Sequence, residues 1–279
     1  MAAETLETTP GMSRFTEPGP AGTLRQWWQP HRIVLVLVAA LLVVLMITTM
    51  RWDWLPKYSD RLLLGAWRTV WLLVLSVVIG FLLAVPLGFA QVTGPKLLAW
   101  PARGFCTLIR GTPLLLQLWL LYFGLGSLFP HMPAIRRSFL WDYLRLSWPY
   151  GLLALTLSFA GYEGEVMRGA FAGVPRGELE AARAFGMGRF TTLRRIWLPR
   201  AFYRALPTLG GEVIMQLKST PLVATITVVD VYGVIAQVRQ DTYLVYSPLI
   251  FLAFVYMCLT GILVLLVRRL ESRIPARGA

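Results

Sequence analysis

Polar and ionisable side chains interrupt several long apolar stretches, and these are the residues whose types could do chemistry. A charged side chain at the centre of a bilayer costs about 2.5–3.5 kcal/mol on insertion scales, so it is a functional candidate by default. The strongest candidates share this position inside or at the end of an apolar stretch: Gln117, Tyr162, Glu165, Lys218 and Thr220. We predict that they line a path for a polar substrate.

Three further polar residues belong to the same stretches. They are Glu163, Glu212 and Gln216. Such residues can also lie in interfacial water or form hydrogen bonds between helices. For Glu163 and Glu212 both interpretations stay open.

The sequence lacks the residue patterns of a disulfide, a metal site and a nucleotide-binding loop. Cys106 and Cys258 fall in apolar segments without the spacing of a disulfide or metal site. The two histidines, His31 and His131, are isolated, and no H-E-x-x-H motif is present. No phosphate-binding G-x-x-x-x-G-K-[ST] loop occurs. The nearest stretch is Gly-Pro-Lys at residues 94–96, which has neither a first Gly at the required spacing nor a Ser or Thr after the Lys. We therefore predict no metal, no bound cofactor and no catalytic residue in this chain.

The composition places the elements that carry the polar residues in a membrane. Of 279 residues, 56% are hydrophobic and 15% charged, and the mean hydropathy is +0.60. One water-soluble domain could not bury this much apolar surface. A spanning helix needs about 20 apolar residues, so the chain has no room for a large soluble catalytic domain.

Apolar runs predict an all-α, polytopic transmembrane bundle of six spans. The runs cover residues 33–50, 67–90, 111–128, 147–164, 206–235 and 246–267. Lys218 to Pro221 interrupt the fifth run. Residues 1–31 are rich in Thr, Gly and Pro and predict a disordered tail. No small-residue cleavage site follows the first run, so we expect an uncleaved span.

The net charge of +13 is a topology signal. In a soluble protein it would suggest nucleic acid, but most of the 27 Lys and Arg residues fall on alternate connections between spans. Because cytoplasmic segments hold the excess of positive charge, both ends of the chain are predicted to be cytoplasmic. Arg110 is then expected to anchor the cytoplasmic end of the third span. No nucleic-acid partner is predicted.

The connection between the fourth and fifth spans is polar yet patterned. Residues 178–185 predict a short helix whose early Glu side chains oppose the positive end of the helix dipole. Gly186 suits a left-handed cap. A second amphipathic stretch follows, and Leu198 and Pro199 are expected to end it before the next span.

This connection has two interpretations from its residues. A basic amphipathic hairpin could lie on anionic lipid. Alternatively it docks a soluble partner, because Ala181, Ala182 and Ala184 leave little bulk between the helix backbone and whatever packs on it.

The spacing within the connection resembles a known signature. Residues 180–182 (Glu-Ala-Ala) are followed after three residues by Gly186, after nine more by Ile196, and then by Leu198 and Pro199. This pattern is similar, at every signature position, to the EAA loop in permeases of ATP-binding cassette (ABC) importers.

Other segments resemble the polar amino acid permeases of that class. Residues 110–124 are similar to an "RGTPLLLQ…YFG" stretch, and residues 162–169 to the segment before the EAA loop. Residues 218–222 correspond to a "KDTSL" stretch, with Ser219 in place of Asp and Pro221 in place of Ser.

The resemblance implies a domain organisation. It covers residues 58–273 and is strongest to the M-type subunits of histidine/lysine/arginine/ornithine and opine permeases. A five-helix importer core would occupy 58–273, with the EAA loop at 175–200. An extra span at 32–57, a tail at 1–31 and a tail at 274–279 complete the chain. In such permeases the five-helix core has its N-terminus outside the cytoplasm. One added span before the core would therefore place the N-terminus of this chain inside, as the charge distribution predicts.

The resemblance also implies a function and partners. The chain would be the permease subunit of an importer that moves polar amino acids or related compounds from periplasm to cytoplasm across the bacterial inner membrane. A cytoplasmic ATPase dimer would bind ATP and Mg²⁺, a homologous permease subunit would complete the pore, and a periplasmic solute-binding protein would deliver the substrate. The residues assigned to ATPase coupling are Gly177, Glu178, Glu180, Ala181, Ala182, Gly186, Ile196, Leu198 and Pro199.

The sequence leaves open which amino acids are carried, and two other classes of membrane protein remain as alternatives. Carboxylates would suit a cationic amino acid, whereas Lys218 could hold an α-carboxylate. A secondary transporter driven by an ion gradient would show inverted repeats, and the sequence shows no convincing one. A non-transporting membrane scaffold fits the loop but leaves the polar residues of the spans unexplained.

Overall fold

A computed structural model describes residues 48–272 and positions 34, 37, 38, 41 and 44. The chain divides into two compact units, Met1–Arg51 and Trp52–Ala279. The predicted tails at 1–31 and 274–279 lie outside the described residues, as does most of the predicted span at 32–57.

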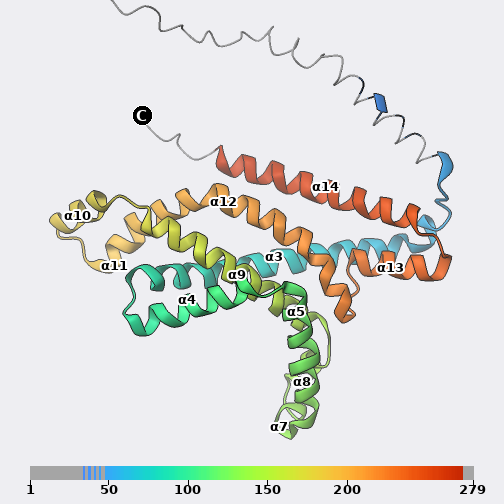
Figure 1. Cartoon of the computed structure of the whole chain (residues 1–279), viewed down its shortest axis with the longest axis horizontal. Helices are drawn as coiled ribbons and strands as arrows, with labels where there is room; N and C mark the ends of the chain where they lie inside the picture. Colours follow the sequence, from blue (N-terminus) through green and yellow to red (C-terminus); the bar gives the residue numbers. More distant parts are fainter. Residues whose placement is uncertain (1–33, 35–36, 39–40, 42–43, 45–47, 273–279) are drawn as a thin grey trace, which may run out of the picture. The chain divides into compact units, whose positions relative to one another are not determined.

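Every regular element in the described part of the second unit is helical, which confirms the predicted all-α class (Figure 1). The elements are α3 (Leu55–Thr93), α4 (Lys96–Gly111), α5 (Leu114–Trp119), a π-helical turn (Leu120–Leu125), α6 (Gly126–Leu128), a 3-10 turn (Phe129–His131), α7 (Pro133–Arg136), α8 (Trp141–Leu144), α9 (Trp148–Ala172), α10 (Arg176–Ala184), α11 (Arg189–Thr192), a π-helical turn (Leu193–Trp197), α12 (Leu198–Ser219), a 3-10 segment (Thr220–Ile226), α13 (Val231–Thr242) and α14 (Tyr246–Glu271).

Three described helical segments are long and apolar enough to cross a membrane. They are α3, Leu114–His131 and α14. The bent pair Arg189–Ile226 and Val231–Thr242, which meets at 51°, adds a fourth if it counts as one span. The number of six spans and the cytoplasmic position of both ends stay predictions.

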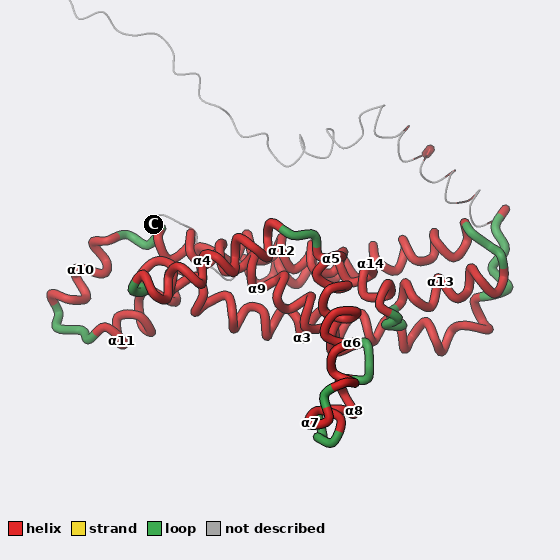
Figure 2. The backbone as a smooth tube through the Cα atoms, turned by 60° about the horizontal axis from the view of Figure 1, so that its bottom comes forward, coloured by secondary structure: helices red, strands yellow, loops and turns green. Residues whose placement is uncertain are grey.

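Glycines let α9 pack closely between α3 and α4 (Figure 2). A Cβ atom at Gly88 of α3 would lie 2.7 Å from the backbone nitrogen of Arg168, and one at Gly164 of α9 would lie 2.9 Å from the sulfur of Cys106. Small residues at such crossings allow close backbone approach, the usual basis of helix association in membranes. This packing fixes where the end of α4 meets α9.

Helix α4 lies between the predicted second and third runs, where the apolar pattern predicts no span. Its buried residues are Ala99, Ala102, Cys106 and Ile109, a spacing of three and four that marks one helix face. Lys96, Arg103 and Arg110 lower the mean hydropathy of residues 96–111 below that of a membrane-spanning helix. The periodicity was the signal that could have found it.

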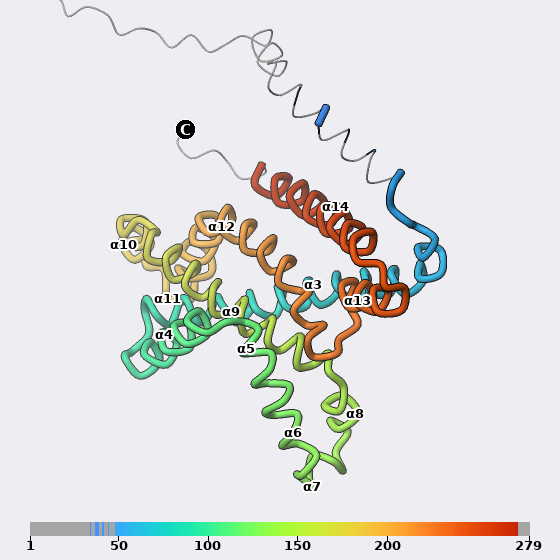
Figure 3. The backbone as a smooth tube through the Cα atoms, turned by 45° about the vertical axis from the view of Figure 1, so that its right-hand side comes forward, coloured from blue at the N-terminus to red at the C-terminus, as the bar shows by residue number. Residues whose placement is uncertain are grey.

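Helices α5 to α8 extend away from the bundle formed by α3, α4, α9 and α12 (Figures 1 and 3). The base of this extension is tied to α9 by Tyr150, whose hydroxyl donates to the Leu144 carbonyl at 2.7 Å. The rings of Tyr122, in the extension, and Tyr150 also meet edge to face, with centroids 5.6 Å apart. The extension therefore has a fixed root on α9.

The predicted interruption near Lys218 is confirmed. Helix α12 begins at Leu198, eight residues before the predicted apolar run starts at Leu206, and ends at Ser219. Thr227 then takes a left-handed φ of 67° before α13. Arg68 Nη1 of α3 donates to the Val229 carbonyl at 3.0 Å, and this satisfies one backbone group that the break exposes.

Candidate functional site

The first site is the EAA loop, residues 175–200, whose helix α10 ends as predicted. Gly186 has a φ of +72°, a conformation that strains residues with a Cβ. The Gly186 N–H donates to the Arg183 carbonyl at 2.9 Å, and the Met187 N–H donates to the Ala182 carbonyl at 3.0 Å. These two bonds form a Schellman cap that satisfies the last carbonyls of α10.

The EAA loop is fixed firmly to the ends of α3 and α9. The rings of Phe89, Phe171 and Trp197 pack together, with centroids 5.5 to 5.9 Å apart. Trp197 Nε1 donates to the Phe171 carbonyl at 2.9 Å. Glu178 of α10 accepts from Arg200 Nε of α12 at 2.9 Å. A force on α10 would therefore reach α9 and α12.

The exposed surface of the loop differs in part from the expectation. Glu180 and Ala181 are exposed, whereas Ala182 is 3% exposed and packs inward. The free surface instead carries two rings, Phe185 at 88% and Phe190 at 74% exposure. Ala182 is therefore a contact within the chain.

The predicted helix end at Leu198 and Pro199 is wrong. The chain passes from α11 through the π-helical turn directly into α12. Pro199 lies in the first turn of α12, where its missing N–H costs no helical hydrogen bond. Ile196 lies in the π-helical turn and is half-buried.

The second site is a cavity of about 490 Å³ between α4, α9 and α12. Its lining residues come from the α4–α5 corner, from the middle of α9 and from the last turns of α12. They are Arg110, Gly111, Thr112, Pro113, Leu114, Ser158, Phe159, Tyr162, Glu212, Met215, Gln216 and Ser219. Three regions of the sequence thus form one open cavity whose lining is largely apolar but includes a positive and a negative side chain.

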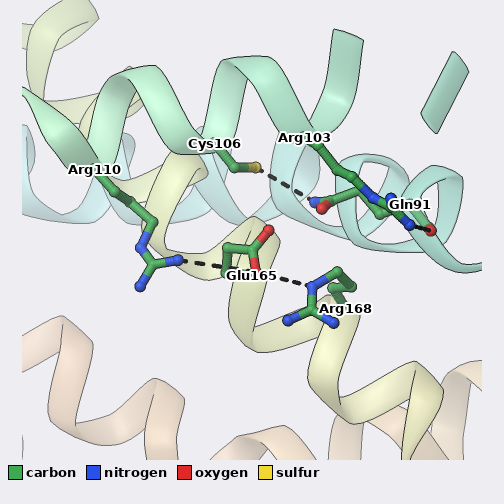
Figure 4. Close-up of polar contacts among 6 residues, drawn as sticks. All are labelled: Gln91, Arg103, Cys106, Arg110, Glu165 and Arg168. Carbon is green, nitrogen blue, oxygen red and sulfur yellow. Dashed lines mark hydrogen bonds and ion pairs between the residues drawn. The ribbon is translucent and has the colours of Figure 1, made fainter. Parts of the chain in front are cut away.

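Arg110 is the site residue that the sequence interpretation missed. It closes the last turn of α4 and lines the cavity, rather than serving only as an anchor at the end of a span. Its guanidinium lies 5.7 Å from the ring centre of Tyr162, and its Nη1 lies 3.8 Å from Glu165 Oε2 (Figure 4). The same oxygen accepts from Arg168 Nε at 2.8 Å. The match of residues 110–117 to a permease motif was the signal available.

Gln117 does not line the cavity. Its Nε2 donates to the Ile109 carbonyl at 2.8 Å and to the Thr112 hydroxyl at 2.8 Å. These bonds satisfy backbone and side-chain oxygens where α4 ends and α5 begins. Gln117 therefore shapes the corner that carries Arg110.

The remaining predicted pathway residues have separate positions. Thr220 is buried, donates to the Leu217 carbonyl at 2.8 Å and lies 3.0 Å from the Tyr256 hydroxyl. Lys218 is exposed and is not among the lining residues. Glu163 is fully buried, and neither carboxylate oxygen has a hydrogen-bond partner in the described part of the chain. The structure thus joins Tyr162 and Glu165 to Arg110 and leaves Lys218 and Thr220 outside this group.

Comparison with known proteins places these features in a family. Residues 76–275 match the family of binding-protein-dependent transport system inner membrane components. The chain is 40% identical over 182 residues to the octopine transport system permease protein OccM of Rhizobium meliloti, covering 65% of this chain and 73% of the relative. It is 38% identical over 210 residues to the histidine/lysine/arginine/ornithine transport system permease protein HisM of Escherichia coli K12, covering 75% and 87%.

Solved structures agree with this placement. A crystal structure of an amino acid ABC transporter with histidines superposes with a TM-score of 0.68 at 29% identity, covering 81% of this chain and 100% of that one. An inward-facing MetNI methionine ABC transporter shares the fold, with a TM-score of 0.56 at 18% identity over 78% of this chain and 95% of that one. The chain therefore belongs to the family of binding-protein-dependent transport system inner membrane components.

Proposed function

We propose that this chain is the permease subunit of an ABC importer that carries polar amino acids or opines from the periplasm into the cytoplasm. The relatives are permeases of octopine and of histidine/lysine/arginine/ornithine transport systems. The observation that carries the proposal is the cavity between α4, α9 and α12, because its otherwise largely apolar wall contains the charged residues Arg110 and Glu212 with the hydroxyl groups of Ser158 and Tyr162. Such a wall suits a small zwitterion.

The EAA loop supports coupling to a separate ATPase. Its exposed rings and α10 offer a docking surface, and its attachment to α9 and α12 would carry motion to the cavity. In this proposal ATP and Mg²⁺ bind to the partner, and this chain binds no cofactor and no metal. The coupling residues are Gly177, Glu178, Glu180, Ala181, Ala182, Gly186, Ile196, Leu198 and Pro199.

The assembly we propose has an ATPase dimer in the cytoplasm, a homologous permease subunit beside this chain and a periplasmic solute-binding protein outside. The chain would cross the bacterial inner membrane six times and contact its lipid. The importer core would occupy 58–273, preceded by the tail at 1–31 and the extra span at 32–57, with 274–279 as the other tail.

Reconstitution tests the proposal. The chain is expressed with its neighbouring genes, purified, placed in proteoliposomes and assayed for uptake of radiolabelled arginine, histidine, glutamine, glutamate and octopine. We expect a co-purified ATPase and uptake that needs ATP and the solute-binding protein. Uptake by the chain alone under an ion gradient would instead identify a secondary transporter. A stable complex without uptake would identify a scaffold.

A further inference from the structure

Two hollows follow one another along the seam where α3 meets the chain that leads from the EAA loop into α12. Ring contacts mark this seam, since Phe81 meets Phe202 with centroids 5.9 Å apart and Phe89 meets Trp197 at 5.5 Å. The hollows share one face of α3, because lining residues recur on it at spacings of four, three and four: Leu82, Pro86, Phe89 and Thr93. The two hollows therefore lie in line along the helix.

The first hollow is an apolar groove of about 450 Å³, formed by residues within 81–86 of α3 and 198–203 of α12. The hydroxyl of Tyr203 is the one polar side-chain group in its lining. The groove is open at the surface, where Leu82 is 66% and Tyr203 50% exposed. Because α3 is long and apolar enough to span a membrane, an apolar chain suits this groove.

The second hollow is a basic recess of about 640 Å³, formed by Phe89 and Thr93 of α3 and by residues within 179–197 of the EAA loop. It lies at the end of the bundle where α3 turns into α4 (Figure 1). Its lining includes Arg183, Arg189 and the ring of Trp197, and no carboxylate. The recess is thus both positively charged and partly aromatic.

The two arginines of the basic recess have donors left for an anion. In the described part of the chain no carboxylate pairs with Arg183 or Arg189, because Glu178 is paired with Arg200 at 2.9 Å. Glu180 lines an adjoining recess and not this one. A guanidinium carries five donors in a rigid fork that matches the geometry of a phosphate.

The order of the two hollows matches that of an amphiphile. The basic recess lies at the last turn of α3, and the apolar groove lies seven residues earlier, about 10 Å along the helix. A phospholipid carries its phosphate and its acyl chains in the same order. Basic pockets between membrane helices bind anionic head groups in this way.

We propose that this seam binds an anionic phospholipid, with its phosphate between Arg183 and Arg189 and an acyl chain in the apolar groove. The two interpretations that the sequence left open for the loop then apply to different sides of it. The exposed side of α10 faces the proposed ATPase, and the side toward α3 holds lipid. This goes beyond the proposed function, because binding needs no transport.

Lipid binding to the full chain, purified in detergent, tests the proposal. Native mass spectrometry counts bound molecules during titration with phosphatidylglycerol or phosphatidylcholine of the same acyl chains. Both lipids carry a phosphate, but the choline cation is repelled by two arginines. Because hydrogen bonds between charged groups change affinity by about tenfold or more, we expect phosphatidylglycerol to bind with a Kd lower by that factor. Equal Kd values would overturn the proposal.

Paired arginine variants separate a built site from general attraction to a basic surface. Arg183→Gln with Arg189→Gln should abolish the preference for phosphatidylglycerol. Arg194→Gln with Arg195→Gln removes the same charge from the same loop, at exposed residues that line neither hollow, and should keep the preference. Equal losses in the two double variants would refute the site.

Stability is checked by the thermal unfolding midpoint, which must match that of wild type. Arg189→Gln alone is also measured, so that a result remains if the double variant unfolds. It should give a smaller loss of preference in the same direction. No loss in this variant would count against the proposal.

The acyl chain is tested by filling the groove. Leu82→Trp should weaken phosphatidylglycerol binding several-fold, whereas Leu83→Trp is the matched control, since Leu83 is 42% exposed but lines neither hollow. Unchanged binding in Leu82→Trp would mean that the recess binds a free anion such as inorganic phosphate, and would overturn the lipid assignment.

Other occupants of the seam give different results. If an acidic residue of the ATPase fills the recess, the Arg183 and Arg189 double variant loses the co-purified ATPase with lipid binding unchanged. If a second permease subunit covers the groove, Leu82→Trp separates the two subunits with lipid binding unchanged. Either result refutes the lipid site. Absent uptake by the wild-type complex would instead refute the proposed function, and the lipid affinities would stand.

Discussion

Gln216 connects three helices at the wall of the cavity. Its side chain is 5% exposed, and its Nε2 donates to Ser76 Oγ of α3 at 3.1 Å and to the Leu155 carbonyl of α9 at 2.9 Å. The residue itself is on α12. One buried amide thus sets the distance of α12 from the other two walls, in addition to facing the cavity.

Replacing Gln216 by leucine should therefore loosen the cavity. Hydrogen bonds between membrane helices average about 0.6 kcal/mol and reach about 1.7 kcal/mol, so we expect Gln216→Leu to lose roughly 1 kcal/mol of stability. The measurement is the thermal unfolding midpoint of the purified complex, together with the apparent KM for uptake. Ile214→Leu is the matched control, since Ile214 is also on α12 but is not among the residues that line the cavity. An unchanged midpoint in Gln216→Leu would show that these bonds do not hold the wall.

The EAA loop depends on the geometry of its helix end. The Schellman cap at Gly186 turns the chain sharply from α10 toward α11, and only glycine adopts its φ of +72° without strain. Open space surrounds Gly186, so a larger side chain would act through the backbone and not through a clash.

Gly186→Val should separate ATP hydrolysis from transport. A left-handed conformation costs a β-branched residue at least about 1–2 kcal/mol, so α10 is expected to end elsewhere and lose its fixed angle to α12. ATPase activity and uptake are measured on the same proteoliposomes, and we expect hydrolysis to persist while uptake falls by more than tenfold. Gly188→Ala is the control, because Gly188 also lies in open space but has a φ of −62°. Normal uptake in Gly186→Val would contradict the proposal that movement of the EAA loop is carried to the cavity.

The features predicted correctly from sequence are those decided locally. Helix α10 and its Gly186 cap follow from neighbouring residues, and the interruption after Lys218 follows from Pro221 and the polar run. The role of Gln117 and the pairing of Arg110 with Glu165 could not be predicted, because they depend on the angle between α4 and α9. That angle is set by contacts such as Gly164 against Cys106, far apart in sequence.

Two helices connect the EAA loop to the cavity. Helix α12 starts at Leu198 in the loop and carries Glu212 and Ser219 in the cavity wall. Helix α9 carries Tyr162 in the wall and Phe171 under Trp197. At 1.5 Å per residue the 22 residues of α12 extend over roughly 33 Å. Pro207 lies inside α12 between the loop and Glu212, a position where a helix can bend. Helix α9 has no proline between Tyr162 and Phe171, so we expect α9 to transmit a movement of the loop to the cavity most directly.

Transmission of this kind requires the EAA loop to lie in the cytoplasm, and labelling of single cysteines tests that topology. Both native cysteines are free, and they are first replaced by serine. A membrane-impermeant maleimide is then applied to intact cells carrying Ala181→Cys or Thr9→Cys, and to permeabilised cells. Because most Lys and Arg residues fall on the predicted inside segments, above all around the EAA loop, we expect both positions to react only after permeabilisation.

The matched outside position is Ser138→Cys, between the predicted third and fourth spans. It should react in intact cells. Reaction of Thr9→Cys in intact cells, with Ala181→Cys still protected, would mean an odd number of spans and would remove the extra N-terminal span. Reaction of Ala181→Cys in intact cells would refute the proposed ATPase-coupling role of the loop, since the proposed ATPase dimer would lie in the cytoplasm.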